Sequence, residues 1–310
     1  MTKFALVFPG QGSQSRGMMN GYADYLVVRE TFAEASEVLK QDLWQLAAEG
    51  EDAQLNATVN TQPLMLTAGL AVFRAWQSVN GPVPTVLAGH SLGEYTALVA
   101  AGALAFTDAL PLVRYRAECM QQAVPEGTGG IAAILGLDDD SVRAVCSEAA
   151  HNEVLEAVNF NSPGQVVIAG NRSAVERGME LAKVKGAKRA IMLPMSVPSH
   201  CSLLKGAAEK LRDYLSHVSV QPPSIPVLHN ADVRSYNDTG AIKDALVRQL
   251  YSPVRWVETV VEFGRLGMTH NVECAPGKVL AGLNKRIDPA QQSLSLHDGT
   301  AIHAALTALA

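Results

Sequence analysis

The chain has 310 residues, 48% of them hydrophobic, and a formal net charge of −5. This length predicts a large core, arranged as one domain with an insertion or as two domains. The acidic balance argues against general nucleic-acid binding, which needs a basic face. No apolar run reaches the roughly 18 residues of a membrane span, and the apolar N-terminal segment is broken at Pro9, unlike a signal peptide. We expect a soluble, cytoplasmic protein.

Strand and helix patterns alternate along the first part of the chain. Strands are expected at residues 4–8 and 85–88. Helices are expected at about 26–40, 62–78, 94–102 and 107–122. Such alternation predicts a parallel sheet covered by helices.

The rhythm changes after Pro125-Glu126-Gly127-Thr128-Gly129-Gly130. Strands at 131–137, 154–160, 165–170 and 188–193, with helices at 139–150 and 174–185, give the order β-α-β-β-α-β, which is the ferredoxin-like pattern. The chain then returns to the larger unit, with helices expected at 202–216, 239–250, 253–266 and 278–285 and strands at 226–230 and 269–272. We predict a large α/β domain of residues 1–127 and 195–310 and a small inserted domain of residues 128–194.

The sequence Gly89-His90-Ser91-Leu92-Gly93 lies between an expected strand and an expected helix. In that context G-x-S-x-G indicates a nucleophilic serine on a sharp turn. The two glycines let strand and helix pack closely, and Ser91 presents its hydroxyl outward. The amide of Leu92, at the helix N-terminus, points to where an oxyanion would form.

A serine nucleophile needs a base within hydrogen-bond reach. His200 ends the loop Ser196-Val197-Pro198-Ser199-His200, which returns from the small domain and could face the turn across a cleft. His90 adjoins Ser91, but neighbouring residues on a sharp turn point apart, so we expect it to be structural or to line the entrance. His151, His217, His297 and His303 lie in polar or terminal stretches and indicate surface positions.

A second oxyanion donor should come from a loop after another strand. Pro9-Gly10-Gln11-Gly12-Ser13-Gln14 qualifies because its glycines let backbone amides approach a ligand. The alternative is a phosphate-binding loop, although both the third glycine of a dinucleotide fingerprint and the Gly-Lys-Ser/Thr of a P-loop are missing. Arg114 and Arg116 lie on the helix expected at about 107–122, after the helix that follows Ser91. Either guanidinium could bind a carboxylate in the cleft through two hydrogen bonds.

The four cysteines, Cys119, Cys146, Cys201 and Cys274, are scattered without a C-x-x-C pair. This spacing argues against a zinc site and a disulfide framework, so we expect free buried thiols. Cys201 follows His200 directly, but nothing around it resembles a nucleophile turn.

Taken together, these residues resemble the malonyl-CoA:acyl carrier protein transacylases of bacterial fatty acid synthesis. The resemblance covers essentially the whole chain and rests on residues 8–14, 89–95, Arg116, 159–165, 197–200, Gln249 and 276–278. It implies an α/β-hydrolase-like large domain with a ferredoxin-like insertion, in agreement with the pattern read from the strands and helices. It also implies malonyl-CoA and acyl carrier protein as partners, no cofactor and a monomer.

The resemblance implies a role for each site residue. Ser91 is acylated and His200 is the base; Arg116 holds the malonyl carboxylate; the amides of Gln11 and Leu92 form the oxyanion hole; Gln249 borders the site and its carbonyl orients His200. A hydrolase with the same turn, or a non-catalytic acyl-binding module, remains open, and a buried Arg116 favours transfer of an acyl group that carries a free carboxylate. Basic residues of the small domain, among them Lys183 and Lys188, are either ordinary solvated charges or a landing surface for an acidic carrier.

Overall fold

A computed structural model describes residues 2–194 and 197–310. The larger of its two sheets is parallel throughout and has the order β7-β2-β1-β8-β9. Its strands are β1 (Phe4–Phe8), β2 (Val86–Gly89), β7 (Val227–Leu228), β8 (His270–Glu273) and β9 (Gln292–Ser295). The strands β1 and β2 are parallel neighbours, so their carboxyl ends lie at the same edge of the sheet. The glycine-rich loops that follow these two strands are therefore brought together.

Alternate residues of the central strand β1 serve two different cores. Phe4, Leu6 and Phe8 point to one face, where they join the largest apolar cluster. Ala5 and Val7 point to the other face and pack with Trp256 and neighbouring apolar side chains. A strand buried on both faces requires a continuous apolar sequence, and FALVF provides one.

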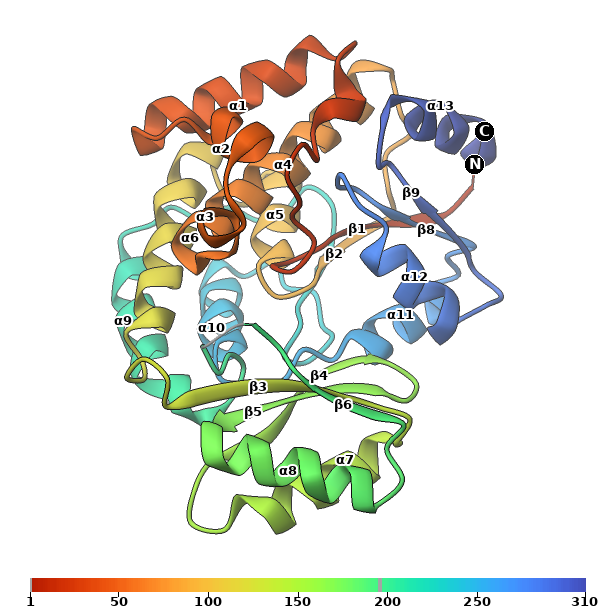
Figure 1. Ribbon diagram of the computed structural model, residues 1–310. Coiled ribbons are helices and arrows are strands. Elements are labelled where there is room, and N and C mark those ends of the chain that lie inside the picture. Colours follow the sequence, from red (N-terminus) through yellow and green to blue (C-terminus); the bar gives the residue numbers. More distant parts are fainter. Residues whose placement is uncertain (1, 195–196) are drawn as a thin grey trace.

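Helices cover both faces of the large sheet (Figure 1). The larger cluster is built with α1 (Leu26–Leu39), α2 (Leu43–Glu49), α3 (Asp52–Asn56), α4 (Thr58–Ser78), α5 (Gly93–Ala100), α6 (Phe106–Gln121), α9 (Lys205–Ser216), α10 (Thr239–Gln249) and α13 (Gly299–Leu309). The other face is covered by α11 (Trp256–Arg265) and α12 (Val279–Ile287). Among the described residues, no helix has both the length and the apolar character needed to cross a membrane.

The second sheet is antiparallel and has the order β4-β5-β3-β6. It contains β3 (Gly129–Leu135), β4 (Leu155–Ser162), β5 (Gln165–Asn171) and β6 (Arg189–Met192), and α7 (Asp139–Ala150) and α8 (Arg172–Val184) pack against it. This is the ferredoxin-like order, so the predicted fold class, a parallel α/β domain with a ferredoxin-like insertion, is confirmed. Figure 1 shows this sheet below the large domain, with both of its helices on the far side.

The small sheet is joined to the large domain by backbone hydrogen bonds as well as by the chain. The amide of Val254 donates to Val158 O at 2.8 Å, and the amide of Phe160 donates to Val254 O at 3.0 Å. The exposed edge of β4 is thereby paired with a segment of the large domain, which fixes the small sheet beside the carboxyl ends of β1 and β2.

Several element limits differ from the sequence-based expectations. The strand expected at 226–230 contains only β7, and the helix expected from 253 begins at Trp256. The sequence patterns did not indicate α2, α3, β9 and α13. The helices α2 and α3 are short, and the small polar residues of β9 have low strand propensity. The predicted domain limit at 195 and the loop residue Ser196 lie outside the described residues.

Candidate active site

Ser91 lies on a sharp turn between β2 and α5 with φ 52°, a left-handed conformation that is strained for serine. The turn is tight because glycines stand where the elements touch. A Cβ at Gly93 would lie 2.0 Å from the carbonyl oxygen of Phe8, and one at Gly89 would lie 1.9 Å from the backbone of Gly93. As the sequence pattern predicts, the two glycines allow α5 to pack closely against β1 and β2.

The side chain of Asn230 fixes this turn from the neighbouring strand end. Its Oδ1 accepts the amide of Ser91 at 2.7 Å, and its Nδ2 donates to the carbonyl of Gly89 at 2.6 Å. Asn230 is fully buried just beyond β7, which pairs with β2. The strained serine is therefore held by two hydrogen bonds that a solvated turn would lack.

His200 approaches Ser91 from the segment that follows the small domain. Its Nε2 lies 2.7 Å from the Ser91 Oγ, and its Nδ1 lies 2.7 Å from the backbone oxygen of Gln249. A carbonyl accepts but never donates, so this contact places the proton on Nδ1 and leaves the Nε2 lone pair facing the serine hydroxyl. The geometry is that of a nucleophile with a base oriented by a neutral acceptor.

The environment of His200 disfavours its charged form. Burial lowers the pKa of the imidazole to about 3, and the positive charge of Arg116 acts in the same direction. A neutral imidazole at physiological pH is the form that can accept a proton from Ser91.

Arg116 is fully buried on α6 and reaches the same point. Its guanidinium donates to the side-chain oxygens of Gln62 at 2.8 Å and Gln249 at 2.9 Å, and one nitrogen lies 3.3 Å from the Ser91 Oγ. Arg114, the other candidate, bonds instead to the carbonyl of Leu39 and to the side chain of Gln41. Of the two arginines on this helix, Arg116 is the one in the cleft.

These groups open into a cavity of about 150 Å³ between the two sheets. The large domain contributes Gln11, Leu92 and His90 to its wall, and the small domain contributes Asn159 and Asn161. Among the described residues, the backbone amides of Gln11 and Leu92 have no hydrogen-bond acceptor. Two unpaired amides beside a nucleophile are the arrangement that an oxyanion hole requires.

His90 connects the two domains at the cavity wall. Its Nε2 lies 2.8 Å from the Asn161 Oδ1, and its ring lies 5.6 Å from the ring of Trp256. Burial lowers the pKa of His90. The expected entrance residue thus lies in the wall, while Gln249 lies fully buried behind Ser91 and outside the lining.

Sequence reasoning missed several buried residues around the site. Gln62, His229, Asn230 and Trp256 received no role, and Glu94 was recognised only as part of a motif. A polar pair directly after a strand next to β2 was the available signal for His229 and Asn230. Nothing in the sequence around Gln62 distinguishes it from an ordinary polar residue on a helix.

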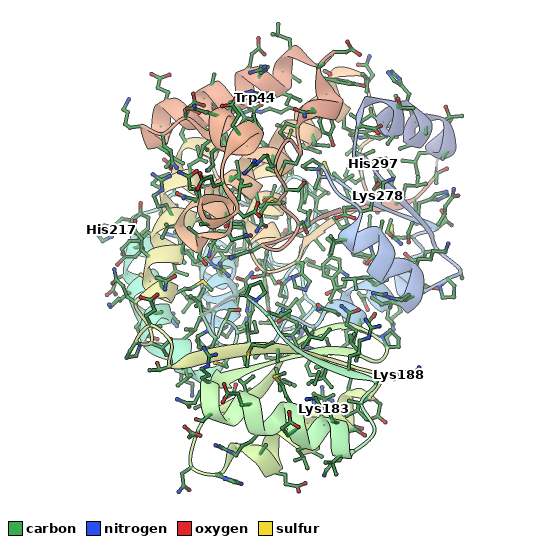
Figure 2. The ribbon with its side chains drawn as sticks, in the orientation of Figure 1. Trp44, Lys183, Lys188, His217, Lys278 and His297 are labelled. Atoms are coloured by element: carbon green, nitrogen blue, oxygen red, sulfur yellow. The ribbon has the colours of Figure 1, made fainter. Side chains whose placement is uncertain are left out.

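The other reactive side chains lie elsewhere or are inert. Cys201 is buried, donates to the carbonyl of Pro198 at 3.1 Å, and has its pKa raised to about 12 by burial. His217 and His297 lie on opposite flanks of the molecule (Figure 2), and neither lines the cavity. Within the described parts of the chain, no group of three metal-binding side chains gathers.

The fold and the site define an α/β enzyme built around a serine on a strand–turn–helix. Comparison with known proteins agrees, because the acyl transferase domain family matches residues 5–292. The chain therefore belongs to the acyl transferase family.

Its relatives are similar along their whole length. A malonyl CoA-acyl carrier protein transacylase of Salmonella typhimurium is 53% identical over 99% of this chain and 100% of its own. The crystal structure of an acyl-carrier-protein S-malonyltransferase from Burkholderia pseudomallei 1710b is 61% identical, with a TM-score of 0.97 over 99% and 100% of the two chains. A malonyl-transacylase in complex with a type II PKS acyl-carrier protein is 48% identical, with a TM-score of 0.98 over 99% and 100%.

Proposed function

We propose that this chain transfers a malonyl group from malonyl-CoA to the phosphopantetheine thiol of acyl carrier protein, through a malonyl ester on Ser91. The observation that carries the proposal is the position of the Arg116 guanidinium, which forms no salt bridge with any described residue and lies 3.3 Å from the hydroxyl that His200 contacts. A buried cation beside a nucleophile selects an acyl group with its own negative charge. The full-length similarity to malonyltransferases supports the same substrate.

In the first half-reaction, His200 accepts the Ser91 proton at Nε2 as the Oγ attacks the thioester carbon. The resulting oxyanion accepts hydrogen bonds from the amides of Gln11 and Leu92, each contributing about 2.7–4 kcal/mol by analogy with removal of one such donor. The C–S bond then breaks, and the coenzyme A sulfur takes the proton from His200. Malonyl remains on Ser91, with its carboxylate on Arg116.

The second half-reaction reverses these steps with a different thiol. His200 accepts the proton of the phosphopantetheine thiol, the sulfur attacks the malonyl ester, and the proton returns to the Ser91 oxygen. The chemistry balances without a cofactor, and a thioester is reactive enough for a serine–histidine pair without a third carboxylate. Attack by water instead of the thiol would make the chain a hydrolase.

We also propose that this chain acts as a monomer in the cytoplasm and that residues 128–194 form its small domain. Several basic residues of that domain form salt bridges, with the pairs Arg172–Glu176, Arg177–Glu153, Lys183–Glu180 and Lys185–Glu148. These pairings favour Lys188 of the small domain and Lys278 of the large domain, both labelled in Figure 2, as contacts for an acidic carrier.

Intact-mass measurement tests the proposal directly. Mixing with malonyl-CoA should add one malonyl group to the protein, and holo-acyl carrier protein should remove it while gaining the same mass. The Ser91→Ala variant should show no addition and should keep its fold. Loss of the group to water at the same rate without carrier would identify a hydrolase, and an adduct on Ser91→Ala would rule out this nucleophile.

A further inference from the structure

The guanidinium of Arg116 has no directly bound counter-ion. Its partners are the neutral side-chain oxygens of Gln62 and Gln249 and the hydroxyl of Ser91. Within residues 2–194 and 197–310 it forms no salt bridge, although it is 1% exposed. A buried charge without an opposite charge is strongly unfavourable, so the fold must supply the compensation from farther away.

Glu94 is a fully buried carboxylate on the other side of Gln249. Its Oε2 accepts the side-chain amide of Gln249 at 2.9 Å and the backbone amide of Asn230 at 2.8 Å. Its Oε1 lies 2.7 Å from the Nδ1 of His229. An ionised carboxylate fits these neighbours because it accepts only, whereas a protonated one would turn a donor toward donors.

His229 does not supply the positive charge that balances the carboxylate of Glu94. Its Nε2 has no hydrogen-bond partner among the described residues, so a second proton on the buried ring would have no acceptor. A neutral ring that donates from Nδ1 satisfies Glu94 and leaves its negative charge uncompensated.

The side-chain amide of Gln249 lies between the two charges. Its Oε1 accepts from Arg116 and its Nε2 donates to Glu94, so each end of the amide dipole faces the charge that it attracts. Burial lowers the pKa of Arg116, while Tyr95 and Glu94 oppose this shift. Burial raises the pKa of Tyr95 and keeps it neutral, so the negative charge near Arg116 is the carboxylate of Glu94, whose hydrogen-bonding neighbours favour the acceptor-only form.

We propose that Glu94 is the counter-charge of Arg116, held one amide group away so that the guanidinium remains free for the carboxylate of an incoming acyl group. A direct salt bridge would stabilise Arg116 equally well but would have to be broken by every substrate. Glu94 is in this view a positioning residue that acts through Gln249. The part of the inference that concerns the acyl group rests on the proposed function.

A double-mutant cycle in stability tests the charge pairing without any substrate. Glu94→Gln keeps the size and the acceptor for Asn230 and Gln249, and His229 can accept its new N–H at Nδ1 by moving its own proton to Nε2. The cost of leaving that proton without an acceptor is the same in both backgrounds and cancels in the cycle. We expect this variant to lower the melting temperature by about 4–10 °C in the wild-type background and by less than half as much in an Arg116→Met background. Equal losses in both backgrounds would overturn the proposal.

Glu273→Gln provides the matched control. Glu273 is also fully buried but is held by the amide of Ala281, away from Arg116, so its effect should be the same in both backgrounds. If Glu94→Gln alone does not fold, recovery of folding in the double variant with Arg116→Met would support the pairing. Failure of both to fold would overturn it, because Glu94 would then be required whether or not Arg116 is present.

Kinetics test the consequence for the substrate. Removing the negative charge of Glu94 strengthens the field of Arg116, so the ratio of kcat/KM for malonyl-CoA to that for acetyl-CoA should rise about 3- to 30-fold in Glu94→Gln. A purely structural role would lower both values together and leave the ratio unchanged, which would contradict the proposal. If neither substrate is used even by the wild type, the proposed function fails while the stability cycle still reports on the charge pairing.

Discussion

At the scale of single residues, the site depends on one buried positive charge that acts on two neighbours. The guanidinium of Arg116 lies 3.3 Å from the Ser91 Oγ and contributes to the lowered pKa of His200. The same charge therefore adds to the effect of burial in lowering the pKa of His200, and in the proposed function it binds the anionic acyl group. Both consequences can be measured separately.

The pH dependence of acylation reports the state of His200. Its pKa is lowered to about 3, first by burial and second by Arg116, so the imidazole is neutral at every pH above that value. We expect kcat/KM for acylation by malonyl-CoA to change by less than about twofold between pH 5 and 8, with no inflection near 6.5, the usual histidine value. Rapid quenching followed by intact-mass measurement provides the rates.

A decline in the acylation rate with a midpoint near pH 6.5 would contradict the lowered pKa of His200. Arg116→Met serves as the control because it removes the second cause of the shift. Any acid limb of its profile should lie at higher pH than in the wild type.

Replacement of Arg116 by alanine tests the substrate class. Truncation leaves the malonyl carboxylate unpaired in a buried site, so kcat/KM for malonyl-CoA should fall by about 30- to 4,000-fold, which corresponds to about 2–5 kcal/mol. Acetyl-CoA lacks the carboxylate, and its turnover should fall little or rise. Both substrates are measured at one pH with wild type and variant; equal losses would mean that Arg116 supports the fold and not the acyl group.

At the scale of elements, the nucleophile depends on how closely α5 approaches β1 and β2. A Cβ at Gly93 would lie 2.0 Å from the carbonyl oxygen of Phe8, and in the neighbouring loop a Cβ at Gly10 would lie 2.5 Å from the carbonyl oxygen of His90, which is also too close for a side chain. Gln11, Ser91 and Leu92 line the same cavity. The oxyanion hole that we propose would thus be a product of backbone packing.

Gly93→Ala should separate α5 from β1. Its Cβ would overlap backbone atoms that cannot move independently, so we expect a loss of about 3 kcal/mol or more in the free energy of unfolding. Gly282→Ala is the matched control: this glycine lies within α12, and an added Cβ meets nothing within 4 Å, so the helix should gain about 0.5–1 kcal/mol. Urea unfolding measures both; a Gly93→Ala protein as stable as the wild type would show that the turn can relax.

At the scale of the whole molecule, the cavity lies between the parallel sheet of the large domain and the antiparallel sheet of the small domain. The large parallel sheet supplies the turn with Ser91, and the small antiparallel sheet supplies the opposite wall with Asn159 and Asn161. Backbone hydrogen bonds between β4 and Val254 of the large domain hold the small sheet against that domain. The cavity consequently exists only when both domains are folded.

Global stability should depend on pH through Glu273, at the end of β8. Burial raises the pKa of this carboxyl to about 7, so between its usual pKa of 4.5 and 7 the folded state binds more protons than the unfolded state. Stability should therefore fall as pH rises through this range, by roughly 3 kcal/mol in total. Glu273→Gln should remove this dependence. Melting temperatures of variant and wild type at pH 5 and 8 test this expectation. The same change in melting temperature between the two pH values in both proteins would contradict the assignment to Glu273.

Local sequence determined the elements and the reactive groups of this protein. The apolar run of β1, the glycine spacing around Ser91 and the β-α-β-β-α-β order are short-range patterns, and each specifies a structure by sterics and burial alone. The sequence also pointed to His200, because a nucleophilic serine requires a base, and it offered Arg114 and Arg116 as carboxylate clamps, of which the family resemblance selected Arg116. The catalytic roles of these residues remain predictions.

Tertiary structure alone decided the surroundings of those groups. Gln62, Glu94, His229 and Asn230 come from distant parts of the chain, and their importance lies in hydrogen bonds that form only when α4, α5, α6 and α10 pack together. For Arg114 and Arg116, which the residues by themselves left open, the structure shows that Arg116 lies on the buried face of α6. Hydrogen bonding and burial are properties of assembled neighbours, so the sequence could indicate the reactive residues but not the network that holds them.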